Sequence, residues 1–275
     1  MEQTKLNELK QIASKIRLGV LEGVHAAASG HPGGSLSISD ILAYLYFEEM
    51  NVRADEPNWA DRDRFVLSKG HTAPALYATL ALKGFFPESE LSKLRHVDSF
   101  LQGHPDMKGT PGIDMSTGSL GLGFSTACGM ALAAKIDGKA YRTYTIVGDG
   151  ESEEGQIWEA AMFASHYKLD NLCLIVDWNG LQIDGTVEEV MNPTPHDNKL
   201  EAFGFHVISI DGHDFEQIAA AFAEAKTVKG KPTAIIAKTV KGKGVSFMED
   251  QVGWHGSAPN DEQYEKAVAE IKAAM

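Results

Sequence analysis

The sequence predicts an α/β protein with a doubly wound, mainly parallel sheet and helices on both faces. Short β-rich runs alternate with helical patterns, and this alternation is typical of parallel sheets whose strands are connected by helices. The clearest strand–helix–strand unit combines β-rich runs over 142–147 and 171–177 with a helical pattern over 153–169. Apolar residues make up 43% of the 275 residues, so the chain can bury a full core around such a sheet.

The other predicted elements continue the alternation on both sides of this unit. Leu6 to Ala28 carries apolar residues at helical spacing, so one face of this first helix should pack against the core. Further helices are expected over 39–49, 73–83, 124–136, 219–227 and 260–274. Strands are expected over 64–69, 206–210 and 233–239. We interpret residues 1–275 as one domain.

Charge and cysteine content exclude several classes of protein. The net charge of −13 argues against a general nucleic-acid binder. Cys128 and Cys173 lie in apolar helix and strand patterns, so we expect buried thiols in a reducing compartment. The charged N-terminus lacks an apolar signal core, and no stretch approaches the ~20 apolar residues that span a bilayer. These features predict a cytoplasmic protein that does not insert into a membrane.

Polar oxygen ligands follow both strands of the central unit. The first strand ends on Gly148-Asp149-Gly150 and the second on Trp178-Asn179-Gly180. Because parallel neighbours in such a unit bring their carboxyl ends together, Asp149 and Asn179 should meet at one rim. A carboxylate, an amide oxygen and nearby carbonyls suit Mg²⁺ or Ca²⁺, and Mg²⁺ usually bridges to phosphates. The unit therefore predicts a Mg²⁺–diphosphate site.

The same unit resembles a known signature. The Gly-Asp-Gly turn, a helix of this length and Asn179 at the next strand end are similar to the thiamine diphosphate signature. Glu154-Gly155 and Ile183-Asp184-Gly185 resemble transketolase more narrowly. The resemblance implies the diphosphate-binding (PP-type) fold of this family. It also implies that thiamine diphosphate is held through Mg²⁺, with Ca²⁺ as another fitting ion, on Asp149, Asn179 and the Leu181 carbonyl. The chain departs from the family at Trp178, where Asn or Asp often precedes the conserved Asn.

Four histidines lie in loops at scattered positions, unlike a zinc site. Two lie in His-Pro loops, in Ser29-Gly-His-Pro-Gly-Gly34 and Gln102-Gly-His-Pro105. The resemblance assigns His31 and His104 to the substrate channel, where they would bind sugar hydroxyls. His71, in Leu-Ser-Lys-Gly-His, and His255, in Trp-His-Gly, resemble residues that reach the diphosphate.

Two of these motifs also allow plainer interpretations. At the strand-to-helix turn, His71 could simply cap the helix that follows. The basic loop 241–244 before His255 could be a solvated linker, because it lacks the spacing of a phosphate-binding P-loop.

Further site residues follow from the resemblance. Small residues in Thr-Gly-Ser-Leu-Gly-Leu-Gly let the backbone approach a ligand, and the family places Gly118, Ser119 and Leu120 against the cofactor. The family also uses the equivalent of Gly150 for the diphosphate. The equivalent of Glu154 faces the neighbouring subunit's cofactor ring, and that of Glu159 belongs to the same carboxylate network. Asp177 is expected to form a hydrogen bond near the cofactor.

The resemblance covers the diphosphate-binding half of a transketolase. It implies an N-terminal subunit that transfers a two-carbon glycolaldehyde unit from a ketose or ketose phosphate to an aldose. His31, His71, His104, Glu154 and His255 would be its catalytic residues. It would need a separate C-terminal, pyrimidine-binding subunit, in an assembly at least as large as a heterotetramer with both homo- and hetero-contacts. The cofactor would attack the ketose carbonyl and store the resulting carbanion.

Three alternatives to this interpretation remain at this point. Half-subunits of a 1-deoxyxylulose-phosphate synthase-like enzyme or of a 2-oxoacid dehydrogenase would use the same signature. The histidines of the predicted channel favour a sugar donor over a 2-oxo acid. A non-catalytic cofactor-binding module is the third alternative, and the joint presence of Asp149, Asn179, His71 and His255 weighs against it.

Overall fold

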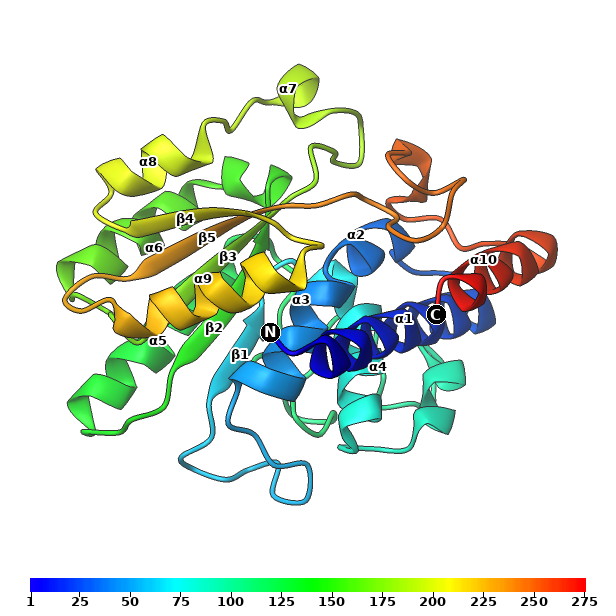
Figure 1. Cartoon of the computed structure of the whole chain (residues 1–275), viewed down its shortest axis with the longest axis horizontal. Helices are drawn as coiled ribbons and strands as arrows, with labels where there is room; N and C mark the ends of the chain where they lie inside the picture. The colour runs from blue at the N-terminus through cyan, green and yellow to red at the C-terminus, as the bar shows by residue number, and fades with distance from the viewer.

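Five parallel strands form one sheet in the order β1-β2-β3-β5-β4 (Figure 1). The structure is a computed structural model that describes residues 1–275. The strands are β1 (Arg64–Leu67), β2 (Thr143–Gly148), β3 (Leu172–Trp178), β4 (His206–Asp211) and β5 (Thr233–Lys238). The predicted parallel α/β sheet is confirmed, and each of its strands lies within about three residues of its expected position.

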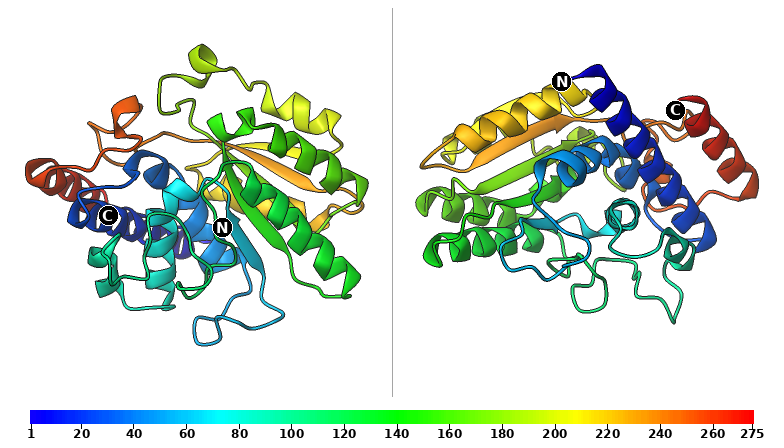
Figure 2. Two further views of the ribbon diagram at one scale, coloured as in Figure 1. Left: turned by 180° about the vertical axis from the view of Figure 1, so that it is seen from behind. Right: turned by 60° about the horizontal axis from the view of Figure 1, so that its bottom comes forward.

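Helices cover both faces of the sheet because alternate strand residues point to opposite sides. In β3, Cys173 and Ile175 join one core, while Leu172, Leu174 and Val176 join the other. The first core is covered by α1 (Gln3–Ala26), α3 (Ser39–Tyr44), α4 (Ala73–Lys83) and α9 (Phe215–Thr227). The second is covered by α5 (Leu122–Ile136), α6 (Gly155–His166) and α8 (His196–Ala202). Figure 2 shows the two layers of helices on either side of the strands.

The last helix, α10 (Asp261–Ala273), packs beside α1 (Figure 1). It begins with a capping box, in which the Asn260 side chain accepts from the backbone of Gln263 and the Gln263 side chain accepts from the backbone of Asn260. This arrangement satisfies two backbone donors at the start of the helix. Asp261 also contacts His25 of α1, with 2.9 Å between Oδ1 and Nε2. The C-terminal segment is thus tied to the first helix.

Two local predictions need correction. The Pro-Gly-Gly sequence after His31 was expected to form a loop, but Pro32–Ser37 forms the short helix α2. Pro32 occupies the first turn, where the missing N–H has no helical partner and the fixed φ favours a helix start. The helix expected over 39–49 divides into α3 and a π-helical turn over Leu45–Glu49.

The remaining helical segments are short. They comprise α7 (Val187–Val190) and single 3₁₀ turns over Gly70–Thr72, Glu88–Lys93, Gly150–Glu153 and Val252–Trp254. Cys128 and Cys173 are free and buried as predicted, and burial raises the pKa of each thiol to about 12. None of the helices combines the length and the apolar character needed to cross a bilayer.

Candidate functional site

The ends of β2 and β3 meet at one rim, as the strand–helix–strand unit predicts. Gly148 pairs with Asp177 in the sheet, and the next backbone amide, that of Asp149, donates to the Asp177 carbonyl at 3.2 Å. Beyond the strand ends, the amide of Gly180 donates to Asp149 Oδ2 at 2.5 Å. The Asp149 carboxylate therefore lies directly against the turn that carries Asn179.

Asp149 carries the charge that most needs a partner at this rim. The residue is 2% exposed. Burial, and then the nearby Asp177 carboxylate, raises the pKa of Asp149 to about 7, although hydrogen bonds from Gly180 and Gly150 and the charge of Lys241 lower it. A divalent cation at this position would compensate the buried charge.

The oxygen donors at the rim fit Mg²⁺ or Ca²⁺. They are the Asp149 carboxylate, the Asn179 amide oxygen and the Leu181 carbonyl, a hard set of the kind these ions take. Nowhere does the chain bring together three or more His, Cys, Asp or Glu side chains that could hold a metal ion. The chain therefore lacks a metal site built from thiolates and imidazoles. A site in which protein oxygens and a phosphate together hold the ion is compatible with these residues.

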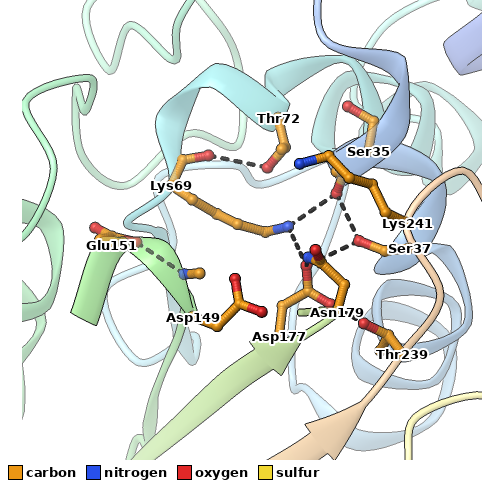
Figure 3. A network of polar contacts seen from close by, with 12 residues as sticks. Ser35, Ser37, Lys69, Thr72, Asp149, Glu151, Asp177, Asn179, Thr239 and Lys241 are labelled. Carbon is orange, nitrogen blue, oxygen red and sulfur yellow. Dashed lines mark hydrogen bonds and ion pairs between the residues drawn. The ribbon is translucent and has the colours of Figure 1, made fainter. Parts of the chain in front are cut away.

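Asp177 lies beneath the rim and is completely buried. Its Oδ2 accepts from Lys69 Nζ at 2.6 Å, from Ser37 Oγ at 2.8 Å and from Asn179 Nδ2 at 2.9 Å (Figure 3). Its Oδ1 accepts from the Thr239 hydroxyl. Burial by itself would raise the pKa of Asp177, but the Lys69 charge and these hydrogen bonds outweigh it and lower the pKa.

A cavity of about 320 Å³ opens above this rim at the carboxyl ends of the strands. Ligands of open parallel sheets bind at this edge. Its lining residues are His31, Gly34, Lys69, His71, Gly118, Leu120, Gly148, Asp149, Gly150, Glu151, Asn179, Leu181, Gln182, Ile183, Lys241 and His255. Most of the residues named from the sequence therefore surround one space. Ser119, His104, Glu154 and Asp177 do not line it.

Three histidines that are dispersed along the chain line the cavity, and a fourth, His104, lies beside them. The ring centroids of His31 and His71 are 5.2 Å apart, those of His71 and His255 5.1 Å, and those of His31 and His255 5.5 Å. His104 lies next to this group, 6.4 Å from His31. Burial is the main reason that the pKa of His31 falls to about 4 and that of His255 to about 3. These imidazoles are neutral at pH 7 and can both donate to and accept from hydroxyl groups.

The glutamates after the Gly-Asp-Gly turn face different directions. Glu151 is buried, and it accepts from Ser68 Oγ at 2.5 Å, from the Gly121 amide at 2.8 Å and from the Gly148 amide at 3.0 Å. Glu154 and Glu159 are exposed, at the start and on the outer side of α6. Glu151 thus joins three segments of the site, while Glu154 is accessible to a neighbouring molecule.

Two buried lysines were missed by the sequence interpretation. Lys69 and Lys241 are each only 2% exposed. Lys241 Nζ donates to the Leu181 carbonyl at 3.0 Å and lies 3.0 Å from His255 Nδ1. Burial lowers the pKa of Lys241 to about 8. The solvated linker considered for the start of loop 241–244 is therefore wrong. Each lysine precedes a glycine just after a strand, but lysines in such turns are usually solvated, so the sequence held no local signal of their burial.

The segment with small residues approaches its neighbours as closely as its composition suggests. A Cβ atom added to Gly123 would lie only 2.5 Å from Cα of Ser68, at the end of β1. The Phe124 amide donates to Ser68 Oγ at 3.0 Å in the same contact. This contact sets the start of α5, and the preceding Gly118 and Leu120 thereby reach the cavity wall.

These observations define an α/β protein with a polar ligand site at the carboxyl ends of a parallel sheet. Residues 8–273 match the family described as "Transketolase, thiamine diphosphate binding domain". The chain therefore belongs to the transketolase family and corresponds to its thiamine diphosphate-binding part.

Three relatives of this chain differ in length. The chain is 50% identical to the 6-deoxy-6-sulfo-D-fructose transketolase subunit of a Clostridium species, over 96% of each chain. It is 45% identical to one named subunit of the apulose-4-phosphate transketolase of Phocaeicola vulgatus, over 97% of this chain and 95% of that one. Human transketolase is also 45% identical over 98% of this chain, but only 43% of the human protein is covered.

Solved structures show the same relationship. Transketolase from Campylobacter jejuni superimposes with a TM-score of 0.91 at 36% identity, covering 96% of this chain and 42% of that chain. Transketolase from Leishmania mexicana gives a TM-score of 0.90 at 35% identity, covering 96% and 41%. The fold interpretation is confirmed, and the chain spans about two-fifths of these longer enzymes.

Proposed function

We propose that this chain is the diphosphate-binding subunit of a split transketolase, which transfers a two-carbon glycolaldehyde unit from a ketose to an aldose. The observation that carries the proposal is the pattern of coverage. Two relatives named as transketolase subunits match over 96% and 95% of their length, whereas the human enzyme is covered over only 43%. A separate subunit would supply the pyrimidine-binding half. Residues 1–275 would form a single domain equivalent to the N-terminal half of the longer enzymes.

The cavity suits thiamine diphosphate and a divalent ion. When bound, the cofactor supplies the carbon nucleophile that adds to a ketose carbonyl and accepts the electron pair released by carbon–carbon cleavage. In our proposal, Asp149, Asn179 and the Leu181 carbonyl hold Mg²⁺, and Ca²⁺ would fit the same oxygens. Gly150, His71 and His255, which line the cavity, would bind the diphosphate. The segment Gly118 to Leu120 would lie against the cofactor.

The histidines would handle the sugar. His31 and His104 offer neutral imidazoles to the hydroxyl groups of the donor, since burial lowers the pKa of each. A neutral imidazole can accept a proton from one hydroxyl while donating to another, as the transfer of a hydroxylated fragment requires. Glu154, exposed beside the cavity, would act toward a neighbouring subunit. This arrangement supports a ketose donor in preference to a 2-oxo acid.

The proposal also concerns the oligomeric state of the enzyme and the cellular compartment in which it works. Because the pyrimidine-binding half would come from another chain, we expect contacts with a second copy as well as with that partner, as in a heterotetramer. The two free, buried cysteines support a reducing, cytoplasmic setting.

Reconstitution tests the proposal. The chain would be purified alone and together with the product of a neighbouring gene that resembles the C-terminal half of transketolases. Each preparation receives thiamine diphosphate, Mg²⁺, an aldose acceptor and either xylulose 5-phosphate or pyruvate. We expect two-carbon transfer from the ketose only when both chains are present. Robust activity of the lone chain would refute the split, and preference for pyruvate would favour a 2-oxoacid enzyme or a 1-deoxyxylulose-phosphate synthase.

A further inference from the structure

The most deeply buried ion pair of the chain lies under the proposed cofactor site. Lys69 and Asp177 form it, with side chains 2% and 0% exposed and 2.6 Å between Nζ and Oδ2. The partners are 108 positions apart in the sequence. Removing two charges from water costs about as much as their attraction returns, so such a pair adds little to stability. Its presence directly beneath a ligand site suggests another role.

Two carboxylates lie close together at this rim, and the charge of Asp177 raises the pKa of Asp149. Asp149 directly follows β2, and Asp177 lies near the end of the neighbouring strand β3. Either carboxylate could attract a divalent ion. Asp177 is the more fully engaged of the two, however, because its Oδ2 accepts from Lys69, Ser37 and Asn179 and its Oδ1 accepts from Thr239. The Asp149 carboxylate accepts only from the backbone amides of Gly150 and Gly180. The Lys69 ammonium thus neutralises Asp177, and the Asp149 charge remains available at the cavity.

Asp177 also determines which end of the Asn179 amide faces the rim. Asn179 Nδ2 donates to Asp177 Oδ2 at 2.9 Å. At the other end of the amide, the Leu181 backbone N–H donates to Asn179 Oδ1 at 3.1 Å. Both hydrogen bonds would be lost if the amide turned over. Its nitrogen would then face the Leu181 N–H, and its oxygen would face the Asp177 carboxylate. The nitrogen is held inward, and the oxygen lies on the side of the Leu181 turn.

Lys69 is itself held in place from two sides. Its ammonium donates to the Gly34 carbonyl at 2.8 Å as well as to Asp177. Ser37 Oγ contacts the same carbonyl at 3.0 Å and thereby joins α2 to the pair (Figure 3). The position of the ammonium therefore depends on the fold of α2 and on the turn after β1.

We propose that Lys69 and Asp177 are positioning residues that reserve Asp149 for the divalent cation and present the Asn179 amide oxygen to it. The inference rests on the proposed function, because it assumes that the cation and diphosphate bind at this rim. Neither residue needs to contact the ion. Partners that orient metal ligands typically change metal affinity roughly 10- to 100-fold when they are removed.

The test measures Mg²⁺ binding separately from activity. Wild type, Lys69→Met and Lys69→Met/Asp177→Leu are titrated with MgCl₂ at fixed thiamine diphosphate, and the half-saturating Mg²⁺ concentration is read by calorimetry. Mn²⁺ bound in place of Mg²⁺ is counted by electron paramagnetic resonance. Melting temperatures without cofactor report folding. Lys243→Met is the matched control, because Lys243 belongs to the neighbouring basic loop but is 36% exposed.

The double variant distinguishes positioning from simple charge compensation. It removes both buried charges together and so leaves no unpaired charge in the core. Ser37, Asn179 and Thr239 lose an acceptor, so its melting temperature should fall below that of wild type while the chain still folds. It also removes the acceptor that orients Asn179, so its half-saturating Mg²⁺ concentration should rise about tenfold or more, as in Lys69→Met. The control should stay within about twofold of wild type.

Two results would overturn the inference. Wild-type Mg²⁺ dependence in the double variant would mean that Lys69 and Asp177 only compensate each other's burial. Unchanged Mg²⁺ dependence in Lys69→Met would exclude the role of the ammonium. If Lys69→Met does not fold, the double variant alone decides. A wild-type chain without Mg²⁺-dependent binding would instead reject the proposed cofactor site itself, and this inference with it.

Discussion

Replacing Asp149 with Asn should stabilise the cofactor-free chain and abolish its Mg²⁺-dependent cofactor binding. Burial beside Asp177 raises the pKa of Asp149 from 3.8 to about 7. The folded chain therefore holds this proton more tightly than the unfolded chain does, and stability falls as pH rises between about 4 and 7. At 1.36 kcal/mol per pKa unit, the ionised carboxylate costs the folded state about 4 kcal/mol at pH 8.

Asp149→Asn removes this electrostatic cost but also weakens the hydrogen bonding of the side chain, so the net stabilisation is smaller. The Gly150 and Gly180 amides donate to different oxygens of Asp149, at 2.8 and 2.5 Å. Asparagine has one oxygen, so one of these amides loses its acceptor, at a cost of about 1–3 kcal/mol. The net gain at pH 8 is then roughly 1–3 kcal/mol. For a chain of this size, this corresponds to a rise of roughly 3–9 °C in melting temperature.

Unfolding of wild type and Asp149→Asn would be followed at pH 5, 6, 7 and 8 with a chelator present. The difference between the two proteins isolates Asp149 from the buried histidines, which titrate in both. This difference should grow with pH up to about 7 and then level off. Addition of Mg²⁺ with thiamine diphosphate should stabilise only the wild type. A variant that is less stable at every pH would refute the reasoning about uncompensated charge, and one that still gains from Mg²⁺ would refute the metal assignment.

Three further predictions concern the framework of the site. Gly123→Ala should destabilise the chain by about 1–3 kcal/mol, because the new methyl group would collide with the backbone of Ser68. Gly129→Ala in the same helix adds a methyl group with nothing within 4 Å and should stabilise the chain slightly. Chemical denaturation of both variants measures the two changes in stability. Cys128 and Cys173 should react with a thiol reagent only after unfolding, and rapid labelling of the native chain would contradict their burial. Burial lowers the pKa of His196 to about 4, so His196 alone should account for about 3 kcal/mol of the stability that wild type loses as pH falls from 6.5 through 4. His196→Gln should lack that loss, and equal acid sensitivity of both proteins would exclude His196 as its source.

The meeting of Asp149 and Asn179 could be predicted from the sequence because it depends on local rules. Two β-rich runs joined by one helix form parallel neighbours, and parallel neighbours align their carboxyl ends. The polar residues that immediately follow such runs then lie at the same edge. The four histidines required more, since nothing in their spacing brings residues 31 and 255 together, and their clustering was expected only through the family resemblance.

The buried lysines show where sequence reasoning stops. A lysine next to glycine in a basic loop is usually solvated, and its burial depends on partners that are distant in sequence. For Lys69, the partner that offsets the cost of burial is 108 positions away. The glutamates after Gly150 give a second example. Glu151 points inward and Glu154 outward because of the 3₁₀ turn over Gly150–Glu153. No composition or periodicity distinguishes them.

The distribution of the cavity residues along the chain has a consequence for how the protein is made. The side chains around the cavity extend from His31 to His255. A ribosome releases the N-terminal part first, so the last of these side chains emerges more than 200 residues after the first. If the proposed site is right, the nascent chain could not bind its cofactor early, and each new molecule would first fold with the Asp149 carboxylate buried and without an ion.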